Sequence, residues 1–209
     1  MNATICPTVL APNPQDYLEQ MQRVEPFANR IHVDMSDGIF ATGKTLGFSE
    51  IWWRGNRTID LHVMYRRPSE HLDIILALSP RLVIVHAEAE GNFIAFANQL
   101  RRHGIEAGIA LLPHTKVEAI QPALEVLDHV LIFSGNLGHF GGEADLSLLE
   151  KVTHVRALKR TVEIGWDGGV NDQNAKQLAE AGVDVLNVGG FIRHASDPAH
   201  AYATLKALV

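Results

Sequence analysis

Cysteine is nearly absent from this chain of 209 residues, since Cys6 is the only one. A single cysteine excludes an internal disulfide framework and fits a reducing compartment. Long apolar runs are also missing, because no stretch approaches the roughly 20 residues that a membrane-spanning helix needs. The first residues lack the charged-then-apolar pattern of a secretory signal. We therefore expect a cytoplasmic protein with no membrane partner.

Clusters of basic residues are a third absence. The chain has 18 Lys and Arg residues against 24 Asp and Glu residues, and its formal net charge is −6. Without a basic patch there is no electrostatic footprint for a polyanion, so nucleic acid is not expected as a partner. A small-molecule substrate is favoured instead.

The length and composition bound the number of domains. Hydrophobic residues make up 46% of the 209 residues, which is enough for one sizeable core and leaves little room for a second. We expect one catalytic domain over residues 1–209.

Short β-branched runs alternate with longer amphipathic stretches along the chain, which is typical of repeated βα units on a parallel sheet. The expected strands are Ala3–Val9, Arg30–Asp34, Thr58–Val63, Leu82–His86, Glu106–Leu111, His129–Phe133, Thr161–Trp166 and Val183–Val188. The expected helices are Pro14–Val24, Ser49–Arg54, Pro68–Leu78, Asn92–Arg102, Val117–Leu124, Leu146–Leu158, Asp172–Ala181 and Asp197–Leu208.

Two α/β architectures fit this alternation. An open doubly wound sheet would need a glycine-rich turn after the first strand, where this chain has Leu10-Ala11-Pro12-Asn13-Pro14. Eight βα units in 209 residues lie near the lower size limit of the closed barrel. We therefore predict a single (β/α)8 TIM barrel and keep the open sheet as the alternative.

Residues able to bind a metal ion lie at the ends of three expected strands. The two-residue period of a strand places His32 and Asp34 on one face, and His62 and Asp167 end two further strands. Active sites of (β/α)8 barrels lie at this end of the strands, and mixed nitrogen and oxygen donors suit Zn²⁺, Mn²⁺ or Fe²⁺. Any one of these histidines could instead be a hydrogen-bonded core residue; the four together favour a metal site.

Glycine pairs follow the last three expected strands, at Gly141-Gly142, Gly168-Gly169 and Gly189-Gly190. Glycine lets backbone N–H groups approach phosphate oxygens, and the loops after the seventh and eighth strands of this barrel often bind phosphate. A single pair is common in any tight turn. The three pairs together predict a phosphorylated substrate.

Five motifs in order resemble those of the ribulose-phosphate 3-epimerase family along nearly the whole chain. They are Ile5-Cys6-Pro7-Thr8-Val9-Leu10, His32-Val33-Asp34-Met35-Ser36-Asp37-Gly38-Ile39-Phe40, Asp60-Leu61-His62-Val63-Met64, His86-Ala87-Glu88 and Trp166-Asp167-Gly168-Gly169.

The resemblance implies a metal-dependent epimerisation beside the ketone of a phosphorylated ketose such as ribulose 5-phosphate. One divalent ion (Zn, Mn, Fe or Co) would be bound by His32, Asp34, His62 and Asp167. Asp34 and Asp167 would also move protons on opposite faces of the substrate, through an enediolate. The implied substrate-binding residues are Thr8, His32, Met64, Gly138, Gly141, Gly142, Gly168, Gly169, Gly189 and Gly190.

The chain departs from the family pattern mainly around the substrate. Thr8 replaces a serine, Ser36 a methionine, Leu112 an asparagine and Gly190 a serine. The loop at 136–143 gains His139, loses a proline and ends in Glu143, which would repel phosphate if it pointed inward. The identity of the ketose phosphate, for example a hexulose or tetrulose phosphate, therefore stays open.

Two further functions and several residue roles remain as alternatives. Decarboxylase or aldolase chemistry on the same barrel is disfavoured, because the segment Asp60–Tyr65 lacks the lysine that related decarboxylases carry there. A sugar-phosphate-binding paralogue without turnover is the other alternative. We interpret His86 and Glu88 as supporting residues, and Trp52, Trp53 and Trp166 as packing or oligomer contacts. A homo-oligomer is expected because most soluble oligomers are symmetric homo-oligomers.

Overall fold

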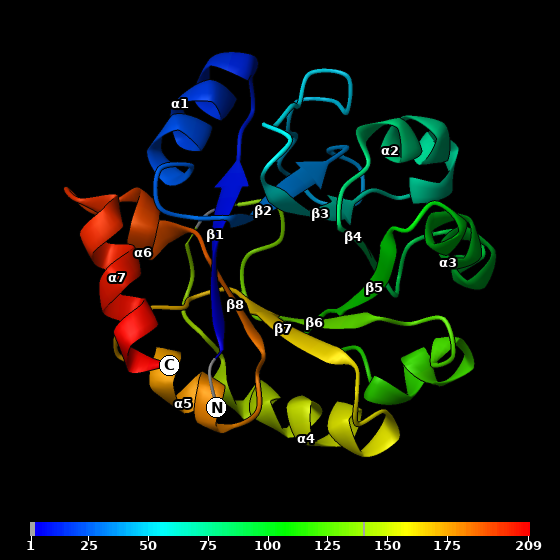
Figure 1. The fold of residues 1–209 in the computed structure, drawn as a ribbon. Coiled ribbons are helices and arrows are strands. Elements are labelled where there is room, and N and C mark those ends of the chain that lie inside the picture. The colour runs from blue at the N-terminus through cyan, green and yellow to red at the C-terminus, as the bar shows by residue number, and fades with distance from the viewer. Residues whose placement is uncertain (1–2, 140) are drawn as a thin grey trace.

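The computed structural model describes residues 3–139 and 141–209, which form a closed barrel of parallel strands surrounded by helices (Figure 1). The strands are β1 Thr4–Leu10, β2 Arg30–Ser36, β3 Thr58–Met64, β4 Leu82–His86, β5 Glu106–Leu111, β6 His129–Phe133, β7 Glu163–Asp167 and β8 Val185–Val188. Each strand pairs with the next in sequence, and β8 pairs with β1 to close the ring. The predicted (β/α)8 barrel is confirmed.

Helices of differing length connect the strands on the outside. The α-helices are α1 Pro14–Val24, α2 Leu72–Leu78, α3 Phe93–Arg102, α4 Leu149–Leu158, α5 Ala175–Glu180, α6 Gly190–Arg193 and α7 Pro198–Leu208, and the 3-10 helices are η1 Pro68–His71, η2 Val117–Ala123 and η3 Leu146–Leu148. The side chains of Asn13, Asn92 and Asp197 accept backbone N–H bonds at the starts of α1, α3 and α7. No helix in the described ranges is long and apolar enough to cross a membrane.

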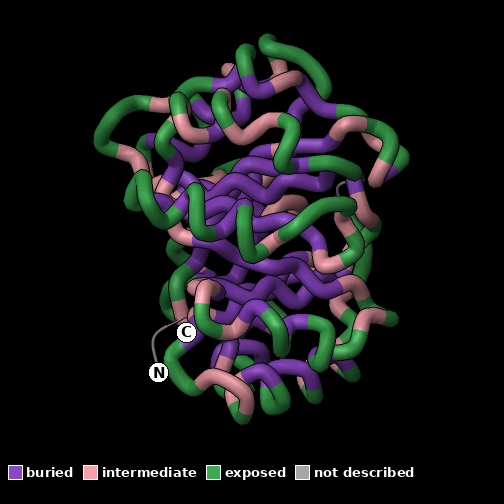
Figure 2. Tube along the Cα trace, turned by 90° about the vertical axis from the view of Figure 1, so that its right-hand side faces the viewer, coloured by how far each residue is buried: buried purple, intermediate pink, exposed green. Residues whose placement is uncertain are grey.

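The core has an outer and an inner part. Outward residues of the strands, such as Val33, Leu61 and Val83, are buried against the helices, and the buried strands occupy the middle of the molecule (Figure 2). Inside the barrel a separate apolar cluster is formed by Leu82, Ile84, Ala110 and Leu131 of β4 to β6. The interior is thus apolar on one side, which leaves its polar chemistry to the other strands.

A network of ion pairs lies at the N-terminal ends of the strands. Arg30 donates from Nη1 and Nη2 to the two carboxylate oxygens of Glu163 at 2.8 and 2.7 Å, and from Nε to Asp60 Oδ2 at 2.7 Å. Arg81 lies 3.3 Å from both carboxylates, and His129 Nδ1 lies 2.9 Å from Glu163 Oε2. Burial would raise the pKa of Glu163, but His129 and Arg30 hold it well below its usual range.

Two predicted helices are wrong in part or in full. Residues 49–54 form a turn followed by irregular chain, in which the Trp52 carbonyl accepts a hydrogen bond from the Tyr17 hydroxyl at 2.6 Å. The predicted α-helix Val117–Leu124 is the 3-10 helix η2, which contains Pro122. Proline has no N–H for the α-helical bond pattern. The other predicted elements exist, with ends shifted by a few residues.

Replacing Arg30 tests the ion-pair network. Arg30→Met leaves the buried Asp60 carboxylate and Glu163 without their main partner, so the free energy of unfolding should fall by about 3–5 kcal/mol. Urea denaturation followed by circular dichroism measures this. As a control, Lys176→Ala breaks an exposed pair with Glu180 and should change stability by less than about 0.5 kcal/mol. Equal losses in the two variants would contradict the assigned role.

Candidate metal centre and active site

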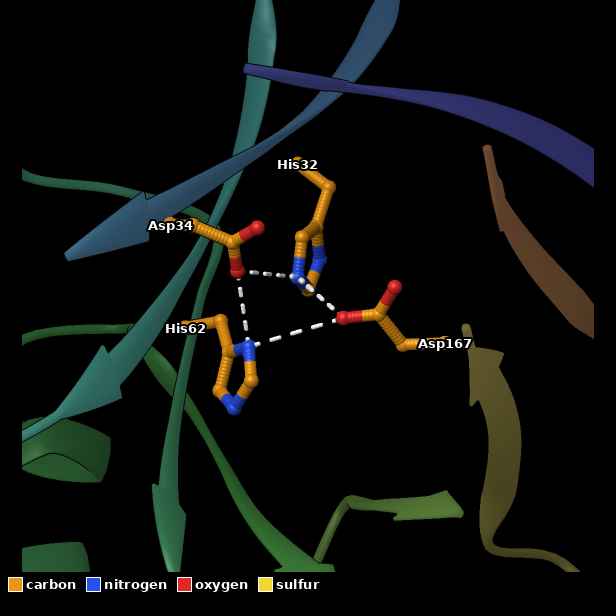
Figure 3. Close-up of side chains that lie close together, drawn as sticks. All are labelled: His32, Asp34, His62 and Asp167. Carbon is orange, nitrogen blue, oxygen red and sulfur yellow. Dashed lines mark hydrogen bonds and ion pairs between the residues drawn. The ribbon is translucent and has the colours of Figure 1, made fainter. Parts of the chain in front are cut away.

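Two histidines and two aspartates meet inside the barrel at the C-terminal ends of the strands (Figure 3). His32 and Asp34 project from β2, His62 from β3 and Asp167 from the last position of β7. Parallel pairing sets Asp34 directly beside His62. One ligand atom from each residue lies within 4.8 Å of all the others. The sequence predicted this convergence, and the structure brings all four together.

The four side chains are buried and in close contact. His62 Nδ1 lies 2.8 Å from Asp34 Oδ1, and His32 Nε2 lies 3.3 Å from the same oxygen. Asp167 Oδ2 is 3.7 Å from both of these imidazole nitrogens. Both histidines are fully inaccessible to solvent. The donors therefore face a common centre and not bulk water.

This donor set fits a divalent metal ion. Neither Nδ1 nor Nε2 of His32 has a hydrogen-bond partner among the described residues, although both atoms are buried. Buried polar atoms without partners are unfavourable, and a cation at the shared centre would satisfy His32 Nε2. Two imidazoles and two carboxylates match the ligand preferences of borderline divalent metals. The group is thus compatible with a bound divalent ion.

The surroundings shift the pKa values of the two carboxylates in opposite directions. Burial would raise the pKa of Asp34, but contacts with His32 and His62 hold it well below its usual range. Burial and the nearby Asp34 charge raise the pKa of Asp167 from 3.8 to about 6. Burial lowers the pKa of His32, but the carboxylates of Asp34 and Asp167 outweigh it and raise the pKa. In the metal-free protein Asp167 is therefore the carboxylate that takes up a proton most readily.

Polar contacts continue from His62 to the outside of the site. His62 Nε2 lies 2.8 Å from His86 Nε2, and His86 Nδ1 lies 3.6 Å from Glu88, which accepts from the Thr115 hydroxyl. Burial lowers the pKa of His86 to about 4, so it is neutral at pH 7. A neutral His86 can accept a hydrogen bond from the Nε2–H of His62, which would leave the lone pair of His62 Nδ1 free for a metal ion. The structure agrees with a supporting role for His86 and Glu88.

A cavity of about 260 Å³ opens above the four residues. It is lined by the predicted residues Thr8, Asp34, Met64, Gly138, Gly141, Gly142, Asp167, Gly168, Gly169, Gly189 and Gly190. His32, predicted to touch substrate, is not part of the lining and lies beneath it. The cavity lies against both the metal-binding group and the glycine loops.

Backbone packing also requires glycine at some of the cavity positions. Gly168 has a φ of 115°, and a Cβ there would collide with the backbone of Gly135. Gly43 approaches Gly138 in the same way, so that the loop after β2 touches the loop after β6. The motif Gly168-Gly169 is thus needed for loop packing whether or not it binds phosphate.

The structure shows the surroundings of three residues that depart from the family pattern. His139 lines the cavity, and its Nε2 lies 2.8 Å from the Thr42 hydroxyl. Glu143 is exposed and does not line the cavity. Ser36 donates a hydrogen bond to the Gly43 carbonyl and anchors the loop after β2. Phe140 lies outside the described residues.

Sequence reasoning missed several lining residues, of which Asn187 matters most. Asn187 belongs to β8 and is only 2% exposed, yet it lines the cavity. Phe133, Asn171 and Phe191 also line it. The alternation Val185-Leu186-Asn187-Val188 was a signal, because one polar residue interrupts an apolar strand on its inward face.

The closed parallel barrel with a buried His and Asp group at its mouth defines a (β/α)8 protein with a candidate metal site. The model of the ribulose-phosphate 3 epimerase family matches residues 4–192. Ribulose-phosphate 3-epimerase of Helicobacter pylori (strain J99) is 32% identical over 203 residues, covering 92% of each chain. The enzyme of that name from Mycobacterium bovis is 32% identical over 212 residues, covering 97% of this chain and 91% of its own.

The chain therefore belongs to the ribulose-phosphate 3-epimerase family. Among solved structures, 3-hexulose-6-phosphate synthase from Salmonella typhimurium superimposes with a TM-score of 0.75 at 16% identity, covering 98% of this chain and 97% of its own. At that identity the likeness concerns the fold alone.

Replacing Asp167 tests the electrostatics of the site. Because its folded pKa lies above the ordinary value, Asp167 favours the metal-free fold at low pH, and this contribution is lost as the pH rises from about 4 through 6. Asp167→Asn should therefore raise the free energy of unfolding at pH 8 by about 1–3 kcal/mol. The gain should vanish near pH 4. Urea denaturation with a chelator measures both; a variant less stable than wild type at pH 8 would contradict the assignment.

Proposed function

We propose that this protein is a metal-dependent 3-epimerase of a ketose phosphate, with ribulose 5-phosphate and xylulose 5-phosphate as the reference substrate pair. The observation that carries the proposal is the buried group His32, Asp34, His62 and Asp167 in a chain of the epimerase family. A hydrogen on a carbon beside a ketone is only weakly acidic, so its removal requires a base and stabilisation of the resulting enediolate.

His32, Asp34, His62 and Asp167 would hold one divalent ion. Zn²⁺, Mn²⁺, Fe²⁺ and Co²⁺ all suit two nitrogen and two oxygen donors. When bound, the ion would act as a Lewis acid that makes the hydrogen beside the ketone more acidic. The neutral His86 would keep the Nδ1 nitrogen of His62 available, through the 2.8 Å contact between their Nε2 atoms.

Asp34 and Asp167 would transfer the protons. They come from β2 and β7 and face each other across the group (Figure 3). One carboxylate would remove the proton at carbon 3, and the other would deliver a proton to the opposite face, which inverts the configuration. In the metal-free protein the pKa of Asp167 is raised to about 6, which supports its choice as a proton-transfer group. Their roles would exchange in the reverse direction.

The remaining lining residues would position the substrate. Thr8 carries a buried hydroxyl without a partner among the described residues, which suits a substrate oxygen. Met64 would cover the planar enediolate with apolar surface. The loops Gly138–Gly142, Gly168–Gly169 and Gly189–Gly190 would hold the phosphate through backbone N–H groups, since neither lysine nor arginine appears among the described lining residues.

We also propose a domain organisation, a cellular location and a homo-oligomeric assembly. We propose that residues 1–209 are one catalytic domain, because the barrel strands extend from β1 near the start to β8 near the end. A cytoplasmic location is supported by the single cysteine, Cys6, which is buried and free. A homo-oligomer is proposed on the general frequency of symmetric assemblies.

The sequence left aldolase chemistry through a Schiff base as an alternative. The described side chains that line the cavity do not favour it. It needs a lysine nucleophile, and none lines the cavity in the described ranges.

Product analysis tests the proposed function. The protein loaded separately with Zn²⁺, Mn²⁺, Fe²⁺ and Co²⁺ is incubated with pentulose, hexulose and tetrulose phosphates, and NMR detects the C3 epimers. We expect ribulose 5-phosphate to be epimerised. Asp34→Asn and Asp167→Asn should each lower kcat by about 10³-fold or more, because each removes a proton-transfer group.

The matched control is Asp73→Asn, since Asp73 is exposed on α2 and should leave kcat unchanged. No epimer from any of these sugars with any of the four metals would refute the proposal. A ligand-induced rise in melting temperature without turnover would instead indicate the binding paralogue considered from the sequence.

A further inference from the structure

A buried amide group in the cavity wall has no assigned partner. Asn187, on β8, is 2% exposed and lines the cavity. Its Oδ1 has no hydrogen-bond partner in the part of the chain that the structure describes. An unsatisfied buried polar atom destabilises a fold, whereas an apolar residue of the same size would avoid that loss. The amide oxygen would therefore gain a hydrogen-bond partner from a molecule that enters the cavity.

The strand register places Asn187 among the polar residues of the site. Asn187 pairs with Asp167 on β7 and with Cys6 on β1, so it lies about 5 Å along the sheet from each backbone. Thr8 lies two residues beyond Cys6 on the same face of β1 and has an unpartnered hydroxyl of its own. Asn187 and Thr8 thus continue the polar wall that begins at Asp167.

Asn187 is not needed to complete the metal-binding group. Four donors already converge within 4.8 Å, and Asn187 is not among them. Away from β7, β8 and β1, strands β3 and β6 line the cavity with the apolar side chains of Met64 and Phe133. A substrate bound between the walls would therefore direct its hydroxyl groups toward Thr8 and Asn187.

The direction of β8 indicates which hydroxyl the amide meets. The strand runs from Asn187 through Val188 into the Gly189-Gly190 turn, so the amide lies between Asp167 and the proposed phosphate loop. In a ketose phosphate with carbon 3 at the aspartates and the phosphate at the glycines, carbon 4 lies between these points. We propose that the Asn187 amide hydrogen-bonds the carbon 4 hydroxyl and makes the site selective for substrates that carry it. This inference rests on the proposed function.

Two substrates and one variant test the amide. Ribulose 5-phosphate is compared with a 4-deoxypentulose 5-phosphate, which lacks only that hydroxyl. For the wild type, kcat/KM should be roughly 10- to 100-fold lower with the deoxy sugar, because the amide is left without a partner. In Asn187→Leu, kcat/KM for ribulose 5-phosphate should fall by a similar factor, and the two sugars should become nearly equivalent.

Three controls separate a specificity role from a structural one. The metal dissociation constant of Asn187→Leu, measured by calorimetry, should match the wild type. Its melting temperature should be unchanged or higher, since an unsatisfied buried amide is removed. Asn98→Leu, the same exchange at an exposed position of α3, should leave the preference between the two sugars intact.

Two results would overturn the proposal. The first is equal turnover of the two sugars by the wild type, which does not depend on any variant folding. The second is an unchanged preference for the hydroxylated sugar in Asn187→Leu. If the wild type turns over neither sugar, the proposed function fails, and calorimetric binding of the two sugars still decides the inference: a preference for ribulose 5-phosphate that Asn187→Leu abolishes supports it.

Discussion

Two carboxylates held close together in a buried site are the constraint around which this barrel is organised. Asp34 and Asp167 cannot both be ionised there without compensation, because burial and mutual repulsion disfavour the second charge. His32 and His62 supply part of that compensation, which holds the pKa of Asp34 low, while the pKa of Asp167 remains raised to about 6. Two acids in one site therefore differ in proton affinity, which is what a pair of proton-transfer groups requires.

The rest of the barrel interior separates the Asp34 and Asp167 pair from the other buried charged residues. The ion-pair network of Arg30, Asp60 and Glu163 lies at the opposite end of the strands and satisfies its own carboxylates. On the side of β4 to β6, the apolar cluster fills part of the barrel interior. Polar groups of a substrate would then form hydrogen bonds with β7, β8, β1 and the glycine loops.

The sequence was sufficient for the parts governed by short-range rules. Strand alternation placed His32 and Asp34 on one face, and the barrel topology then brought His62 and Asp167 to the same end. The segment Ser49–Arg54 was wrongly predicted as a helix; its Trp52 carbonyl accepts a hydrogen bond from the distant Tyr17, a contact that the local sequence does not show. The sequence shows Asn187 as one polar residue in an apolar strand, but its unpartnered amide oxygen depends on the packed neighbours and is seen only in the structure.

The loops at the mouth explain why the reaction is easier to assign than the sugar. The loop after β2 contacts the loop after β6 through Thr42 and His139, and close approach of Gly43 to Gly138 packs the backbones together. Changes there would alter the cavity lining and leave the four side chains of the His and Asp group in place. Glu143, which could have opposed a phosphate, is exposed outside the cavity.

A single-turnover reaction in D₂O tests most directly whether two buried aspartates act on opposite faces. If one carboxylate removes a proton and the other delivers one from solvent, the xylulose 5-phosphate formed from ribulose 5-phosphate carries deuterium at carbon 3 in essentially every molecule. Product that retains the original hydrogen at carbon 3 would contradict the account, because it would require a single group to remove and return the same proton.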